Sequence, residues 1–121
     1  MSDIQSPEPF YSMSRRAGDT LYLSGFGPVE NMQVVGTTIE EQTDWTMRAM
    51  QAVLESEGVT WEDVVRVNVF LLNLADRDRF NAAYMQYFKG PRPTRRLIGA
   101  GDLFMGILLE LDAVAHLGPG R

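Results

Sequence analysis

A ten-residue stretch near the end of the chain, "GPRPTRRLIG" (90–99), places three arginines among prolines and glycines. They are Arg92, Arg95 and Arg96, and each carries a planar guanidinium that can bind a carboxylate through two hydrogen bonds. Neighbouring strand residues point to opposite faces, so Arg95 and Arg96 cannot both enter one cleft from a regular strand. One of the three is therefore a candidate anchor for an anionic ligand, and the others are expected at the surface or between subunits.

A carboxylate follows the arginines inside the apolar run "ILLELDAVA" (107–115), where leucines flank Glu110. A carboxylate on a mostly apolar strand needs a partner or a function. Strands that lie side by side can pair Glu110 with an arginine of "TRRLIG", which would make either a ligand pocket or a structural salt bridge. The alternative is that Glu110 and Asp112 simply mark the solvent face of an alternating strand.

Helices and strands that would position these groups are indicated by capping signals and by hydrophobic periodicity. Thr38 and Glu41 have the spacing of a capping box, and the apolar pattern behind them predicts a helix to about Glu57. A second helix is predicted from 76 to about 88, ended by "KGPRP". Strands are predicted at 19–25, 63–74, in "TRRLIG" and at 104–117, with loop at "GFGPVE".

Alternation within two of these strands predicts which side chains are buried. In 63–74 the apolar face consists of Val65, Val67, Val69 and Leu71, and in 104–117 it consists of Ile107, Leu109, Leu111, Ala113 and Ala115. The order strand, helix, strand, helix, strand, strand predicts an α+β fold in which the helices cover one face of a mixed sheet. Two helices leave the second face needing a partner, so we expect a closed homo-oligomer.

Composition limits the chemistry and the partners. The length of 121 residues predicts a single domain over 1–121, and the net charge of −5 does not favour a nucleic-acid partner, whose phosphates it would repel. There are no cysteines, and His116 is the single histidine, which excludes thiolate catalysis and makes a metal site unexpected. The N-terminus "MSDIQSPEPF" lacks a signal-peptide pattern, and no apolar run could span a membrane; we expect a soluble, cytoplasmic protein.

The chain resembles the Rid family, the reactive intermediate deaminases also called YjgF-like proteins. The resemblance is carried by "LYLSGFGP", "VVRVNVFLLNLADRDRFNAAY", "RPTRRLI" and "ILLELDAVA", which occur in the family's order and at nearly its spacing. It implies a chorismate-mutase-like α+β fold. It also implies a homotrimer whose three equivalent clefts lie between subunits.

The best-known branch of that family hydrolyses enamine and imine intermediates, such as 2-aminoacrylate, to 2-keto acids and ammonia without a cofactor. By this resemblance Arg95 holds the substrate carboxylate, Glu110 is the catalytic carboxylate, and Tyr11, Ser24 and Asn81 belong to the binding site. The assignment fits the side-chain chemistry, because a guanidinium fork orients a small carboxylate. A neighbouring carboxylate such as Glu110 can position water and shuttle its proton.

Some residues depart from the pattern of that branch. Arg96 and Leu97 follow the anchoring arginine where the branch has a small residue and then a cysteine, and Phe26 stands where it has glutamine. We therefore expect Phe26 and Leu97 to make the substrate pocket more apolar.

Two other functions remain open on the same resemblance. One is a non-catalytic trimer that binds keto acids or similar anions, and the other is a specialised pathway enzyme, such as a 2-aminomuconate-type deaminase or a natural-product tailoring enzyme. Ribonuclease activity, described for some family members, has little support in an acidic chain without a stripe of basic and aromatic residues.

Overall fold

A five-stranded sheet forms the frame of the computed structural model, which describes residues 10–118. Its strands are β1 (Ser14–Ala17), β2 (Thr20–Phe26), β5 (Val64–Leu71), β6 (Thr94–Gly99) and β7 (Leu109–His116). They lie in the order β1-β2-β7-β5-β6, and neighbouring strands are antiparallel except for the parallel pair β5 and β6. Residues 1–9, on which the expectation about a signal peptide rests, lie outside the described part.

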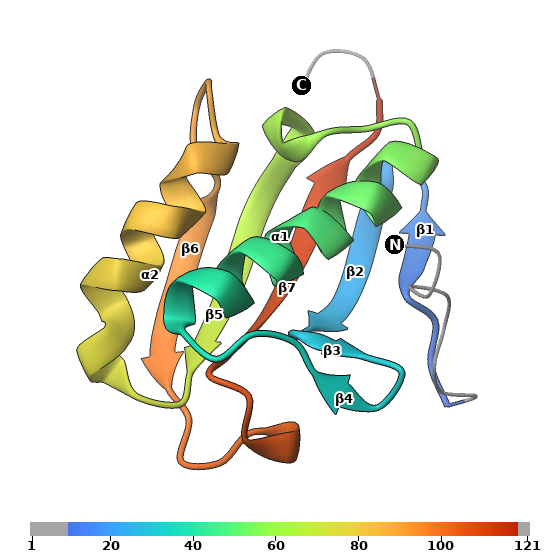
Figure 1. Cartoon of the computed structure of the whole chain (residues 1–121). Coiled ribbons are helices and arrows are strands. Elements are labelled where there is room, and N and C mark those ends of the chain that lie inside the picture. Colours follow the sequence, from blue (N-terminus) through green and yellow to red (C-terminus); the bar gives the residue numbers. More distant parts are fainter. Residues whose placement is uncertain (1–9, 119–121) are drawn as a thin grey trace.

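Two α-helices cover one face of this sheet (Figure 1). They are α1 (Ile39–Ser56) and α2 (Arg77–Tyr84), and α2 lies on the side of β6 while α1 crosses the middle of the sheet. The predicted fold class, a mixed α+β sheet with two helices on one face, is confirmed. The opposite face of the sheet carries no helix in residues 10–118.

Burial along β7 follows the predicted alternation at every position. Leu109, Leu111, Ala113 and Ala115 are at most 1% exposed, and the residues between them are only partly buried. Ile107, the fifth member of the predicted apolar face, is also buried, although it precedes the strand. The helix-covered face of the sheet therefore forms the hydrophobic core.

Strand β5 departs from the prediction at its first residues. The pairing of β5 with β7 shifts register between Val64 and Arg66, so the simple alternation begins only after this irregularity. Val64 consequently lies in the core, whereas Val65 is 49% exposed and its predicted burial is wrong. The remaining members of the predicted face, Val67, Val69 and Leu71, are fully buried.

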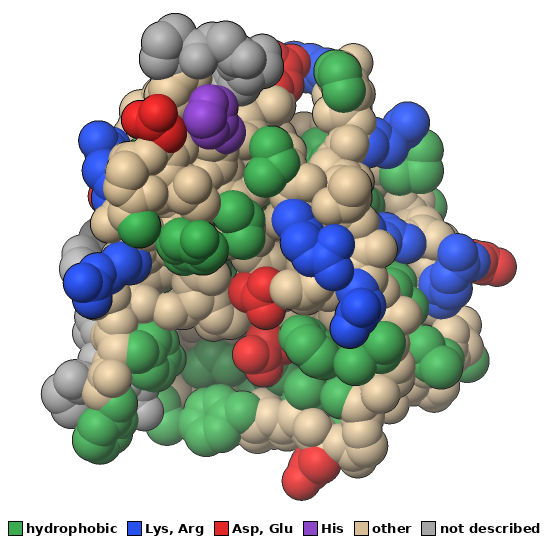
Figure 2. Space-filling view, turned by 180° about the vertical axis from the view of Figure 1, so that it is seen from behind, with side chains coloured by type: hydrophobic (Ala, Val, Ile, Leu, Met, Phe, Trp, Pro, Cys, Tyr) green, Lys and Arg blue, Asp and Glu red, His purple; other side chains and the backbone are tan. Residues whose placement is uncertain are grey.

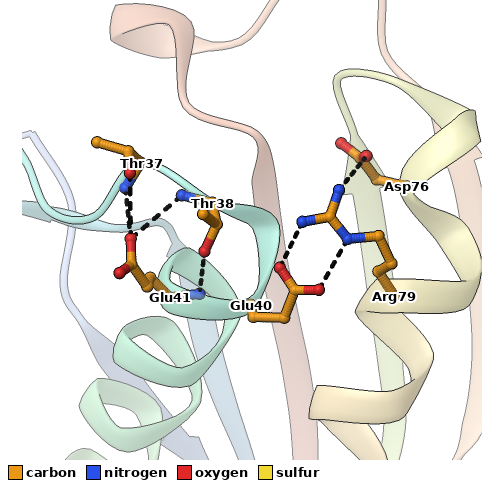
Figure 3. A network of polar contacts seen from close by, with 6 residues as sticks. All are labelled: Thr37, Thr38, Glu40, Glu41, Asp76 and Arg79. Carbon is orange, nitrogen blue, oxygen red and sulfur yellow. Dashed lines mark hydrogen bonds and ion pairs between the residues drawn. The ribbon is translucent and has the colours of Figure 1, made fainter.

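Helix α1 begins at the predicted capping box (Figure 3). Thr38 Oγ1 accepts the backbone N–H of Glu41 at 3.1 Å, and the Glu41 carboxylate accepts the backbone N–H of Thr37 at 2.9 Å. The backbone N–H groups of Thr37, Thr38 and Glu41 are thereby satisfied, and the hydrogen bonds that the carboxylate accepts lower the pKa of Glu41. The apolar pattern of this helix places five residues on one face, of which Ala49, Met50 and Leu54 are buried and Trp45 and Val53 are partly buried.

An arginine joins the two helices at the surface (Figure 3). Arg79 of α2 donates through Nε and Nη2 to the Glu40 carboxylate of α1 at 2.7 and 2.6 Å, and its Nη1 lies 3.9 Å from Asp76. The two-point contact links the first turn of α1 to α2 at the surface. Since both side chains are about half exposed, the ion pair contributes little to stability.

Helix α2 ends earlier than the sequence predicts. A 3₁₀ turn, η3 (Met85–Tyr87), follows the α-helix, and Phe88 is already extended. The tighter turn brings the Phe88 ring to 5.3 Å from the ring of Trp61 and to 4.8 Å from that of Tyr84, measured between centroids. Trp61 is buried in the turn before β5, as expected for a residue that packs this connection.

The sequence did not predict three short strands or any of the four 3₁₀ turns. Strand β1 has the polar sequence SRRA. Strands β3 (Val29–Glu30) and β4 (Gln33–Val34) have two residues each and pair as a short hairpin. The remaining turns are η1 (Trp61–Asp63), η2 (Leu74–Asp76) and η4 (Phe104–Gly106), so β7 starts later than the predicted run at 104–117. None of these segments carries enough alternating apolar residues to be recognised by periodicity.

Candidate active site

The two adjacent arginines of β6 point to opposite faces of the sheet. Arg95 is paired with the fully buried Val67, and its guanidinium lies over the ring of Phe80 in α2, so it faces the helices. Arg96 is paired with Asn68, which lies opposite Asp112, so it belongs to the face without helices. The expected alternation of Arg95 and Arg96 between the two faces of a strand is confirmed for β6.

Glu110 also belongs to the face without helices. It lies opposite Phe70, which in turn is paired with Ile98. Figure 2 shows this face, with acidic side chains near its middle, basic side chains beside them and hydrophobic side chains around them. Its most exposed apolar residues in the sheet include Tyr22 (50%) and Ile98 (43%).

Glu110 and Arg95 do not meet within one chain, so the predicted pairing between neighbouring strands is wrong. Strand β5 lies between β6 and β7, and Arg95 is three positions away from Ile98, the β6 residue level with Glu110. With strands ~4.8 Å apart and a rise of ~3.3 Å per residue, the two Cα atoms are about 14 Å apart. The side chains leave the sheet on opposite faces, so neither a salt bridge nor a shared pocket forms between them.

The carboxylate of Glu110 lies against the backbone of β2 at Gly25. A Cβ atom at Gly25 would stand 3.2 Å from Glu110 Cδ and would collide with Oε2, so any other residue at position 25 would displace this carboxylate. Within residues 10–118 no hydrogen bond or ion pair reaches the carboxylate of Glu110. Burial, and secondarily the negative charge of Asp112, raise the pKa of Glu110, whereas Asp112 accepts a hydrogen bond from Asn68 Nδ2 at 2.8 Å.

Ser24 and Tyr11 lie at the same end of this face as Glu110. The Ser24 hydroxyl donates to the backbone carbonyl of Ser12, and the Ser24 N–H donates to that of Met13 at 2.9 Å. These bonds hold the segment before β1 beside the Ser24-Gly25 step, and they place Tyr11, 47% exposed, next to it. Ser24, Tyr11 and Glu110 therefore make one group of predicted site residues, which we call the carboxylate half.

Arg95, Asn81 and Leu97 make a second group on α2 and β6, which we call the arginine half. The Arg95 Cζ lies 5.0 Å from the ring centroid of Tyr84, and no acidic side chain within the described residues forms an ion pair with it. Asn81 Oδ1 is buried and has no hydrogen-bond partner in the structure. Leu97 follows Arg95 by two positions, is half-buried and packs against the core.

Phe26 belongs to neither half. The pairing of β2 with β7 shifts register between Leu23 and Phe26, and this irregularity turns the Phe26 side chain into the core, where it is 4% exposed. In the single chain it therefore cannot contact a ligand at the surface. The sequence reasoning placed it in a loop, where this inward orientation could not be foreseen.

A hollow of about 460 Å³ lies between the outer surfaces of the two helices. Its lining includes Glu40, Asp44, Asp78 and Arg79, and it contains no predicted site residue. No group of three or more metal-ligating side chains occurs within residues 10–118. No helix in that part of the chain is long and apolar enough to cross a membrane.

Comparison with known proteins identifies the family. The model of the endoribonuclease L-PSP family matches residues 3–117. A RutC family protein of Saccharolobus solfataricus is 37% identical over 116 residues, covering 93% of this chain and 92% of that protein. The 2-iminobutanoate/2-iminopropanoate deaminase of Dermatophagoides farinae is 31% identical over 113 residues, covering 90% and 88%.

The fold agrees with this result. The crystal structure of the Rid family protein YyfA from Yersinia pestis superposes with a TM-score of 0.90 at 28% identity, covering 96% of this chain and 94% of that one. The chain therefore belongs to the endoribonuclease L-PSP family, the YjgF or Rid proteins, as the resemblance implied.

Proposed function

We propose that this protein is a cofactor-independent hydrolytic deaminase that converts small 2-imino or enamine carboxylates to 2-keto acids and ammonia. The proposal rests on two side chains of opposite charge that have no charged partner within the described part of a single chain. Arg95 is a half-buried cation without an acidic partner, and Glu110 is a half-buried carboxylate without a donor, among the described residues. The name of the mite relative, a deaminase of 2-iminobutanoate and 2-iminopropanoate, supports the substrate class.

The proposed site forms between copies of the chain. The face without helices carries the carboxylate half, and contact with the α2–β6 edge of a second copy would bring an arginine half against it. Such an interface joins two different surfaces, so it closes only as a ring, and three copies are the expected number. The exposed apolar residues Tyr22 and Ile98 support burial of this face.

In the proposed reaction Arg95 binds the substrate carboxylate through its two-pronged guanidinium, and this orients the C2 imine. An enamine substrate first tautomerises to the imine, gaining a proton at C3 and losing one from nitrogen. Glu110 takes a proton from water as the oxygen attacks C2 and returns that proton to nitrogen, so the C2–N double bond becomes a single bond. In this adduct a proton passes from the new C2 hydroxyl through Glu110 to nitrogen, the C2–N bond breaks, and ammonia leaves as the 2-keto acid forms. The raised pKa of Glu110 suits a group that first accepts and then returns a proton.

Ser24 has a more limited role than the sequence suggests. Its hydroxyl proton is used in the bond to the Ser12 carbonyl, so its oxygen can accept a hydrogen bond but has no proton left to donate. In the proposed site it would accept an N–H of the substrate or of departing ammonia. Donation to the substrate would fall to Tyr11.

A ribonuclease reading of the family name has less support. Binding of a phosphate backbone requires positive charge, and the chain has 16 acidic and 11 basic residues, a net charge of −5. The arginines of the face without helices also lie beside its acidic groups (Figure 2). A small anion held by a single arginine fits this surface better.

The test is to generate 2-aminoacrylate and an aromatic imino acid in situ in the presence of semicarbazide, and to measure suppression of semicarbazone formation. We expect suppression by the wild type, loss of suppression and of keto-acid binding in Arg95→Ala, and loss of suppression with retained binding in Glu110→Gln. Arg48→Ala, which removes an exposed arginine of α1, is the matched control. If the wild type binds keto acids but suppresses neither product, the protein is a binding module and the deaminase proposal is wrong.

A further inference from the structure

Two aromatic rings hold Arg95 on the surface of α2. The guanidinium carbon lies 5.0 Å from the ring centroid of Tyr84 and 5.7 Å from that of Phe80. Both rings are buried, Phe80 completely and Tyr84 to 3% exposure, and their centroids are 5.3 Å apart with a tilt of 31°. Arg95 therefore packs on a surface formed by two adjacent rings, whose residues are four positions apart on one face of α2.

The two rings can orient the Arg95 guanidinium without occupying it with a protein carboxylate. A protein carboxylate that fixes an arginine occupies one edge of the guanidinium and neutralises its charge, and an arginine without a partner is mobile and must be ordered when the ligand binds. Ring faces attract the guanidinium through its charge and its flat surface, while its N–H groups stay available for a ligand. Arg95 has this second kind of support and has no ion pair within residues 10–118.

We propose that Tyr84 and Phe80 are positioning residues that hold the Arg95 guanidinium ready for an anion and thereby set the affinity of the site for carboxylates. This inference extends the proposed function. It depends on that function only for the identity of the anion. The rings do not touch substrate; they act through Arg95. Their replacement by aliphatic residues should weaken binding of charged ligands and spare binding of uncharged ones.

The Tyr84 hydroxyl contributes less to the positioning of Arg95 than the Tyr84 ring does. Burial raises the pKa of Tyr84, and the positive charge of Arg95 opposes that rise. The phenol is thus protonated at neutral pH. Since the ring face accounts for the stacking, Tyr84→Phe should retain most of the effect and Tyr84→Leu should not.

A purely structural role for these rings makes different predictions. Tyr84 also packs on Phe88, and Phe80 is fully buried, so Tyr84→Leu and Phe80→Leu will both lower stability. Loss of packing alone would leave the environment of Arg95 unchanged, or it would weaken the binding of charged and uncharged ligands equally. Tyr87→Leu is the matched control, because its ring packs on Trp61 and its hydroxyl bonds Asp44, away from Arg95.

The first measurement needs no ligand. In proton NMR the δ-protons of Arg95, assigned by their absence in Arg95→Ala, should be shifted upfield by the ring currents of the two aromatic side chains. We expect this shift to persist in Tyr84→Phe and Tyr87→Leu and to shrink in Tyr84→Leu and Phe80→Leu. An unshifted wild-type resonance, or one that is insensitive to both leucine variants, overturns the inference whether or not the protein is a deaminase.

The second measurement compares binding of pyruvate with binding of its uncharged amide. In Tyr84→Leu we expect pyruvate to bind roughly 3- to 30-fold more weakly, the range for a partly to fully desolvated cation–π contact, with less than about a twofold change for the amide. Where turnover is measurable, KM should rise with kcat nearly unchanged. Equal weakening of both ligands would make the rings structural and refute the proposal.

The outcomes separate this inference from the proposed function. If the wild type shows no turnover but Tyr84→Leu selectively weakens the binding of pyruvate, the deaminase proposal fails and the positioning role of the rings stands. If wild type does not bind pyruvate, the proposed function fails, and the ring-current measurement alone decides the positioning role. Should Tyr84→Leu not fold, Phe80→Leu replaces it with the same expected signs, and Tyr84→Phe remains the conservative variant.

Discussion

A single added methyl group at Gly25 should impair catalysis without disturbing the fold. Gly25 is exposed and its backbone does not need glycine, since it is not among the residues with positive φ. In Gly25→Ala the new Cβ would collide with Glu110 Oε2 and stand 3.2 Å from Cδ, whereas carbon atoms in ordinary contact are about 3.5–4.0 Å apart. The carboxylate must therefore move by on the order of 1 Å. A shift of that size in a catalytic group costs up to about 100-fold in rate, and we expect a 10- to 100-fold lower kcat.

The assay is the semicarbazide competition together with thermal unfolding. Stability should change by no more than about 1 kcal/mol, because the reduced freedom of the unfolded chain partly offsets the crowding. Gly101→Ala adds the same methyl group where no atom lies within 4 Å and should behave as wild type. A Gly25→Ala protein that folds normally and retains full kcat would show that the position of the Glu110 carboxylate does not matter to the reaction, and the reasoning would be refuted.

Further predictions concern the pH dependence of stability and the helix contacts. The raised pKa of Glu110 means that the folded chain holds this proton more tightly than the unfolded chain, so its ionisation costs stability as pH rises above the ordinary value of 4.5. Glu110→Gln should therefore have a higher melting temperature than the wild type near neutral pH, and this difference should disappear below pH 4.5. A difference in melting temperature that stays constant across pH would show that ionisation of Glu110 is not its cause. Thr38→Ala removes the cap of α1 and should cost about 1 kcal/mol in urea unfolding. Arg79→Ala should cost less than about 1 kcal/mol, because the ion pair with Glu40 is exposed, and a larger loss would reveal a tighter link between the helices.

Local signals in the sequence predicted the elements well. The Thr38 capping box lies at the start of α1, and the alternation of Leu109, Leu111 and Ala113 matches their burial in β7. Such features depend on residues close in sequence, so local physical rules capture them. Local irregularities escaped these rules: the register shifts in β2 and β5 reversed the expected environments of Phe26 and Val65.

Strand order could not be predicted from local patterns. The sequence places "TRRLIG" directly before the last strand, which suggested that the arginines and Glu110 lie side by side. In the structure β5 separates them, because β6 pairs in parallel with β5 through the helix that connects these two strands. The alternation of Arg95 and Arg96 was predicted, but the choice of face depends on which strand β6 pairs with.

Two contacts that define the halves of the site were also missed. Gly25 interrupts an otherwise β-rich run, and an isolated glycine in a strand often marks a close approach by another group. That signal was present and could have identified Gly25 as the position where Glu110 lies. The spacing of Phe80 and Tyr84 indicated one helix face, but nothing in the sequence showed that an arginine from a later strand would pack on it.

The two halves of the site differ in how they are encoded along the chain. Phe80, Asn81, Tyr84, Arg95 and Leu97 all lie within the single segment from α2 to β6, residues 77–99. The carboxylate half instead joins residues 11–25 to Glu110, which lie near opposite ends of the chain. If the proposed site is correct, exchanging segment 77–99 with that of a relative would change the residues around the anion in one step, whereas the residues around Glu110 could change only through coordinated substitutions in distant segments.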